Sequence, residues 1–138
     1  MPTFADRVRD NQIRLLVGVA VPLPKAGPPP SSQALVDTGA QKTMVSPKVV
    51  EQTGAIRTDI ASFVPANGKP QETDEFLLNN SIPIATGSQS SRTTYSSGRD
   101  LTVLLLPYSP PGFDVLLGLD FLRPYHITMW NGTFVLSN

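Results

Sequence analysis

Residues 33–40 read Gln33-Ala34-Leu35-Val36-Asp37-Thr38-Gly39-Ala40, an apolar strand that runs into a carboxylate and a turn of small residues. A charged group at the end of a buried strand is costly unless it is paired or has a function, so we interpret Asp37 as a candidate catalytic residue. Gly39 allows the backbone to approach a neighbouring segment closely, and the Thr38 hydroxyl can brace the turn. The motif occurs once, so a site that needs two such groups needs two chains.

The composition is that of a loop-rich β protein. The 138 residues include 14 Pro and 10 Gly, and charged residues make up 16%, below the roughly 25% usual in globular proteins. We expect one domain, 1–138. The net charge of zero gives no electrostatic basis for binding nucleic acid or a membrane surface. With no Cys and one His, the chain cannot build a disulfide framework, a thiolate metal site or a His cluster, and we expect no cofactor.

The order of apolar runs and turn residues predicts an all-β fold, a small closed or sandwiched barrel with one or two short helices. Strands are predicted at 13–21, 34–36, 60–64, 75–78, 82–85, 101–106, 113–118, 126–130 and 133–137. Short helices are predicted at 47–53, after Ser46 as N-cap and before Gly54, and at 119–123. The Pro-rich segment 22–32 is expected to be an exposed connection, and the polar segment 86–100 a mobile surface loop or hairpin tip.

A second motif strengthens the interpretation of Asp37. Residues 115–122 read Val115-Leu116-Leu117-Gly118-Leu119-Asp120-Phe121-Leu122, two apolar residues and a glycine before a short helix. Together with the pattern apolar-apolar-Asp-Thr-Gly-small, this segment resembles the retropepsin-like aspartic proteases, and the resemblance covers about 33–136 of the chain. Viral members often carry a paired Asp and Arg where this chain has Gln41 and Leu119. Because both charged residues are absent, neither is left without its partner. In this respect the sequence is more similar to cellular or transposon-type members.

The resemblance implies a closed barrel of the retropepsin type and an aspartic endopeptidase that acts as a homodimer, with one Asp37 from each subunit. Two carboxylates in contact hold one proton between them. One can then take a proton from water while the other polarises the scissile carbonyl, and aspartic proteases are themselves the standard example of this pairing.

The resemblance also assigns site residues. The catalytic turn is Asp37, Thr38 and Gly39, and a peptide in extended conformation is expected to contact Leu35, Ala40, Gln41, Met44, Val64, Ala66, Asn67, Gly68 and Leu116. The hairpin at 64–70, with Asn67-Gly68 at its tip, is predicted to be a flap over the substrate. The strand at 133–137 is predicted to pair the two subunits.

Four other residues receive less specific roles. We interpret Asp114 and Asp120 as turn and helix-cap residues, His126 as a structural or surface residue, and Trp130 as barrel or interface packing.

Two functions remain open on the sequence. One is a protease, either released from a polyprotein or free-standing, and the other is a peptide-binding or assembly module with little proteolysis. The chain begins without the apolar core of a signal peptide, and no apolar run approaches the roughly 18 residues of a membrane span. We therefore expect a cytoplasmic protein.

Overall fold

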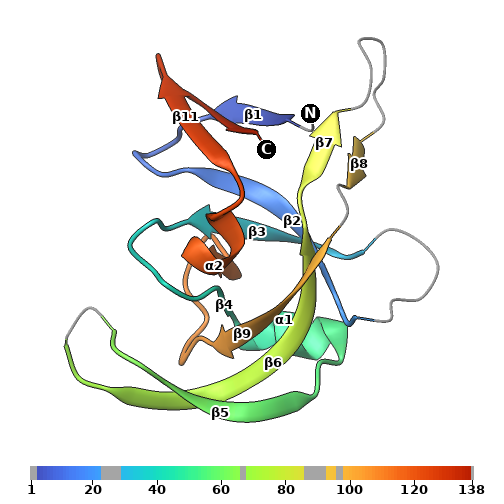
Figure 1. Ribbon diagram of the computed structural model, residues 1–138, viewed down its shortest axis with the longest axis vertical. Helices are drawn as coiled ribbons and strands as arrows, with labels where there is room; N and C mark the ends of the chain where they lie inside the picture. The colour runs from blue at the N-terminus through green and yellow to red at the C-terminus, as the bar shows by residue number, and fades with distance from the viewer. Residues whose placement is uncertain (1–2, 23–28, 66–67, 86–92, 96–97, 138) are drawn as a thin grey trace.

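The computed structural model describes residues 3–22, 29–65, 68–85, 93–95 and 98–137 (Figure 1). The strands are β1 (Thr3–Arg7), β2 (Arg14–Ala20), β3 (Ser31–Val36), β4 (Met44–Val45), β5 (Arg57–Phe63), β6 (Gln71–Ser81), β7 (Pro83–Ala85), β8 (Thr93–Tyr95), β9 (Arg99–Leu105), β10 (Val115–Leu117), β11 (His126–Trp130) and β12 (Thr133–Ser137). The helices are α1 (Pro47–Thr53) and α2 (Leu119–Leu122). This confirms the predicted all-β class with short helices.

The main sheet closes into a barrel. Its strands follow the order β2-β3-β10-β4-β9-β6-β5, and an additional pairing between β2 and β6 closes six of them on themselves. β5 lies outside this closure and forms with β6 the long curved hairpin at the bottom of Figure 1. β10 pairs parallel to β3, with Leu116 opposite Leu35 and Leu117 opposite Val36. This parallel pair brings the ends of two sequence motifs to one place.

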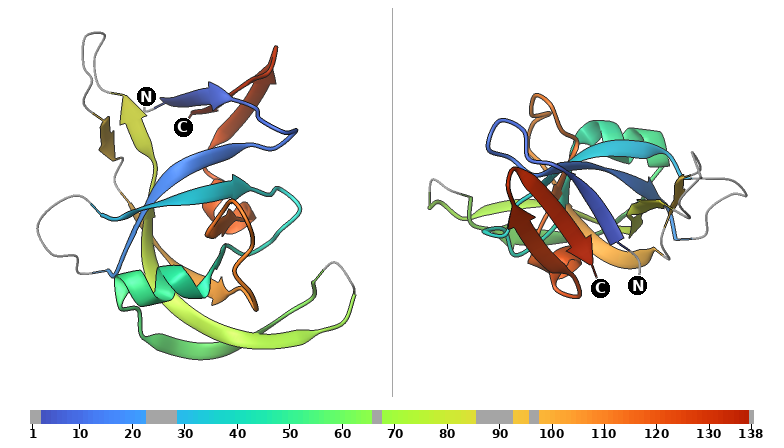
Figure 2. Two further views of the ribbon diagram at one scale, coloured as in Figure 1. Left: turned by 180° about the vertical axis from the view of Figure 1, so that it is seen from behind. Right: turned by 90° about the horizontal axis from the view of Figure 1, so that it is seen from above.

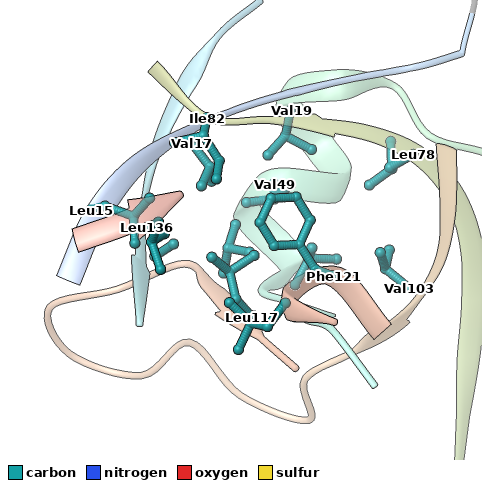
Figure 3. Packing of buried hydrophobic residues seen from close by; sticks show 14 of the residues in the cluster. Leu15, Val17, Val19, Val49, Leu78, Ile82, Val103, Leu117, Phe121 and Leu136 are labelled. Carbon is teal, nitrogen blue, oxygen red and sulfur yellow. The ribbon is translucent and has the colours of Figure 1, made fainter. Parts of the chain in front are cut away.

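The core lies inside this barrel. Alternate residues of β2 (Leu15, Val17 and Val19) are buried, as expected for a strand with one face against the core. Figure 3 shows Phe121 of α2 pointing into the same cluster as Val49 of α1. Full burial of such side chains contributes about 1.5–3 kcal/mol each, so both helices are firmly attached to the barrel.

A second sheet has the order β1-β12-β11. β12 is its central strand, and β1 brings the two ends of the chain side by side, with Thr3 opposite Ser137 (Figure 2). The β11–β12 hairpin turns at Asn131 (φ 49°) and Gly132 (φ 73°), which confirms the predicted Asn-Gly hairpin.

The prediction that 133–137 pairs the subunits is wrong for this arrangement. Both edges of β12 are occupied within the chain, and its Phe134 and Leu136 are buried. The error arose because β1 was not predicted: its run of β-branched and apolar residues, Thr3 to Ala5, is shorter than the four to eight that signal a strand. The edge strands of this sheet are β1 and β11, and neither pairs on its outer edge with another described strand.

Several boundaries differ from the predicted ones. β6 extends over eleven residues instead of 75–78, since pairing on both sides keeps its polar ends extended. β3 begins at Ser31, inside the segment predicted to be a connection, and the short strand β4 was missed. Within the polar segment 86–100, residues 93–95 form β8, which pairs with β7, and β9 begins at Arg99 and pairs with β6, so these described residues lie in strands. The remainder of 86–100, and residues 23–28, lie outside the description.

α1 begins and ends where predicted. Pro47 is at its first turn and Gly54 follows it with a left-handed φ of 68°. Ser46 occupies the N-cap position, but its hydroxyl donates to Asp114 instead of capping the helix. In the part of the chain that the structure describes, no helix is long and apolar enough to cross a membrane.

Candidate active site

The turn after β3 holds Asp37 by its backbone and by its side chain. The Asp37 N–H donates to the Leu117 carbonyl at 3.0 Å, and Asp37 Oδ1 accepts the Gly39 N–H at 2.9 Å. The Ala40 N–H closes the turn on the Asp37 carbonyl at 3.2 Å. One carboxylate oxygen is therefore fixed in direction, and Oδ2 accepts no hydrogen bond from the described residues.

Thr38 does not brace this turn. It is exposed, and its hydroxyl makes no hydrogen bond to any described residue. The bond from Gly39 to the Asp37 carboxylate supplies the bracing that the sequence analysis assigned to the Thr38 hydroxyl.

Gly118 explains why the second motif needs a glycine. A Cβ on this residue would lie 2.6 Å from the carbonyl carbon of Lys42, 2.7 Å from its oxygen and 3.0 Å from the Ala40 oxygen. The backbone that follows the Asp37 turn therefore crosses directly over residue 118. The two segments are then joined by the Leu119 N–H, which donates to the Ala40 carbonyl at 2.8 Å.

Asp120 adds a side-chain connection between the same segments. Its Oδ1 accepts the Thr43 N–H at 2.9 Å, the Thr43 hydroxyl at 2.7 Å and the Phe121 N–H at 2.8 Å. Thr43 is fully buried, and its Oγ1 also accepts the Gly118 N–H at 3.2 Å. Sequence reasoning treated Asp120 as a cap and missed Thr43, because nothing in the local sequence signals a partner 77 residues away.

Three predicted substrate contacts lie side by side. Leu116 is opposite Leu35 on β3 and opposite Met44 on β4, and all three side chains are half-buried. Their neighbours Ala34, Val45 and Val115 are fully buried, so the three half-buried side chains line the face of the sheet away from the core. Asp37 follows Leu35 by two residues, and strand alternation directs it toward this same face.

Ala40 and Gln41 lie beside the turn, where their carbonyls accept from the N-terminal N–H groups of α2. Ala40 is half-buried and Gln41 exposed. The backbone carbonyls of both residues are therefore already used within the chain.

The predicted flap is partly described. β5 and β6 form a hairpin up to the pair Phe63 and Gln71, and Val64 beyond it is exposed. Gly68 has a φ of 78° and donates its N–H to the Pro65 carbonyl at 2.9 Å, as in a tight turn. Ala66 and Asn67 lie outside the described residues, so a flap role for this hairpin stays a prediction.

The ion pairs among the described residues are Arg9–Asp6, Lys48–Asp114 and Arg57–Asp74, and Asp37 is in none of them. The described residues also contain no group of three or more His, Asp or Glu side chains that could hold a metal ion.

Comparisons with known proteins identify the fold. The sequence matches no family profile, and no curated protein is significantly similar to it. A solved structure, a retropepsin-like aspartic protease from Rickettsia conorii, superimposes with a TM-score of 0.60 over 97% of this chain and 89% of that one, at 13% sequence identity. The chain has the retropepsin-like aspartic protease fold, as the sequence motifs predicted.

Proposed function

We propose that the protein is an aspartic endopeptidase that acts as a homodimer, with one Asp37 from each subunit. The observation that supports this most is the position of Asp37. Its turn is fixed to β10 and α2 by the Leu117 and Ala40 hydrogen bonds, and it opens toward the face lined by Leu35, Met44 and Leu116. A half-buried carboxylate beside apolar side chains on a rigid turn is suited to catalysis on a peptide.

The chemistry follows from two such turns facing each other. Because the pair holds one proton, one Asp37 is ionised. This carboxylate takes a proton from a water molecule while the water oxygen attacks the carbon of the scissile carbonyl. The protonated Asp37 donates to the carbonyl oxygen, which becomes the hydroxyl of a tetrahedral intermediate. When the C–N bond breaks, the Asp37 that took the water proton passes it to the leaving amine, and the other Asp37 takes a proton from a hydroxyl of the intermediate, which restores the singly protonated pair. The bond from the Gly39 N–H keeps Asp37 Oδ1 oriented throughout.

The substrate in this proposal is an extended peptide. Its side chains contact Leu35, Met44 and Leu116, and its backbone pairs with the edges of the cleft, as in other cases where a strand is added to a sheet. The β5–β6 hairpin closes over it as a flap.

The dimer needs an edge that can pair two copies, and we assign this role to β11. Its outer edge is free among the described strands, and its sequence, HITMW, contains no Lys, Arg, Asp or Glu that would protect an edge from association. Met129 and Trp130 are 63% and 79% exposed. Figure 1 shows three elements toward the left side of the molecule: β11, the end of β3 and the far end of the β5–β6 hairpin. Antiparallel pairing of two β11 strands about a two-fold axis would then bring the two Asp37 turns toward each other.

The test combines activity with oligomeric state. The purified protein should cleave an unfolded protein substrate at acid pH and sediment as a dimer, whereas Asp37→Asn should remain a folded dimer without activity. The amide is nearly isosteric with the carboxyl group, but a pair of amides cannot activate water. Equal turnover by the variant would place the chemistry elsewhere. A wild-type protein that binds peptides without cleaving them would identify a binding module on this fold.

A further inference from the structure

The attachment of α2 to the catalytic turn is unusual in its chemistry. Gln41 and Leu119 stand where viral members often carry a paired Asp and Arg, and no ion pair among the described residues joins the helix to the turn. Leu119 is 40% exposed, and it contributes only its backbone N–H to this junction. Side-chain attachment therefore depends on the next residue, Asp120.

Asp120 makes more contacts than a helix cap requires. The predicted cap role is wrong: the N-cap position of α2 is Gly118, no side chain caps the helix, and Asp120 lies in its first turn, where its Oδ1 accepts the N–H of the adjacent Phe121. The two bonds from Thr43 come from a different part of the chain, and Thr43 is the residue that ends the segment leading away from the catalytic turn. In addition, the Asp120 N–H donates to the Gln41 carbonyl at 3.2 Å.

The helix that carries Asp120 is itself rigidly held. Phe121 and Leu122 are buried in the core, as Figure 3 shows for Phe121. At the other end of α2, the Arg99 guanidinium donates to the Phe121 carbonyl and lies over the Phe121 ring, 5.1 Å from its centroid. A cation that donates a hydrogen bond at the C-terminus of a helix is favourable, as the Arg99 guanidinium does here. α2 is therefore held at both ends and can act as a rigid support for the turn.

We propose that Asp120 is a positioning residue for catalysis, which sets the position of the Asp37 turn by holding Thr43. This inference rests on the proposed protease function. The action is through Oδ1 alone: all three donors contact that oxygen, while Oδ2 is buried without a hydrogen bond to any described residue. The required property is therefore an acceptor oxygen at this place and not the second oxygen of the carboxylate.

This distinction leads to a sharp comparison of variants. Asp120→Asn keeps an acceptor oxygen with the same shape, so it should retain turnover within about threefold of wild type. Asp120→Ala leaves the Thr43 N–H and hydroxyl buried without an acceptor, and the turn shifts. A displacement of about 1 Å at a catalytic group can cost on the order of a hundredfold, so we expect kcat to fall roughly ten- to a hundredfold with KM changed much less.

Asp114→Ala is the matched structural control. Asp114 accepts the Ser46 hydroxyl at 2.9 Å, and Ser46 is also fully buried, but this bond joins the start of β10 to α1 and not to the turn. It should lower the thermal midpoint about as much as Asp120→Ala while leaving kcat unchanged. All variants are assayed at concentrations where sedimentation shows the dimer.

A second measurement does not depend on proteolysis. Amide exchange of the Gly39 N–H, which is bonded to Asp37, should become at least tenfold faster in Asp120→Ala and stay at the wild-type rate in Asp114→Ala. Wild-type kcat and unaltered Gly39 exchange in Asp120→Ala would overturn the proposal, as would an Asp120→Asn variant as impaired as Asp120→Ala. If the wild-type protein cleaves nothing, the protease function fails, and Gly39 exchange still decides whether Asp120 positions the turn.

Discussion

Replacing Gly118 by Ala tests how closely the two halves of the candidate site are packed. The added Cβ would lie 2.6 Å from the Lys42 carbonyl carbon, about 0.8 Å inside the 3.4 Å at which ordinary contact begins. The atoms it meets are backbone atoms, which cannot rotate away as the end of a side chain can. Either the segment 40–42 or the start of α2 must therefore move by most of an ångström.

Such a movement has calculable consequences. The bond from Leu119 to Ala40, now 2.8 Å, would lengthen to about 3.6 Å and cease to be a hydrogen bond. Overpacking costs about 1–3 kcal/mol, and a lost hydrogen bond adds about 0.5–1.5 kcal/mol. We expect Gly118→Ala to lower the free energy of unfolding by about 2–4 kcal/mol. The displaced turn should also reduce kcat/KM on the order of a hundredfold under conditions where the variant is folded.

The assay is denaturant unfolding together with peptide cleavage, and Gly54→Ala is the control. Gly54 follows α1 with a φ of 68°, and a Cβ there would meet no atom within 4 Å. Its replacement introduces backbone strain of about 1–2 kcal/mol without a clash and away from the turn, so it should lower stability but not activity. A Gly118→Ala protein with wild-type stability and turnover would refute the close approach of the two segments.

Two further predictions concern the edge strand and the hairpin tip. Trp130→Lys places a charge on the exposed end of β11 and should weaken the dimer, so that specific activity falls at dilutions where wild type keeps it; an unchanged dimer by sedimentation would show that β11 is not the interface. Gly68→Pro cannot adopt the φ of 78° or donate to Pro65, so it should reduce turnover much more than thermal stability if the hairpin is a flap. Slow amide exchange across the described part of 64–70, unaltered by a cleft-binding inhibitor, would contradict the flap role.

The parts of the fold that could be predicted carry local signals. Asn131-Gly132 fixes a hairpin by its own φ preferences, and Ser46-Pro47 with Gly54 marks both ends of α1. The Asp37 turn and the Gly118 motif were also recognisable, since each needs particular residues within a few positions.

The parts that were missed depend on distant partners. β1 is extended because β12 pairs with it, and nothing in TFADR predicts this. β6 is longer than its apolar residues because β5 and β9 pair along it. Likewise, the role of Thr43 depends on Asp120, which approaches it only in the folded chain. In each case tertiary pairing, and not intrinsic propensity, determines the structure.

The parallel contact between β3 and β10 has a consequence for how the protein is made. Asp37 lies in the first third of the chain, but the bonds that fix its turn come from Leu117, Leu119 and Asp120 in the last fifth. During synthesis the turn has no support until these residues have left the ribosome, and closing so long a loop is among the slower steps of folding. If the proposed protease function holds, activity would therefore arise only after residues 117–120 have been made and have paired with the turn, and a shorter nascent polypeptide would be inactive.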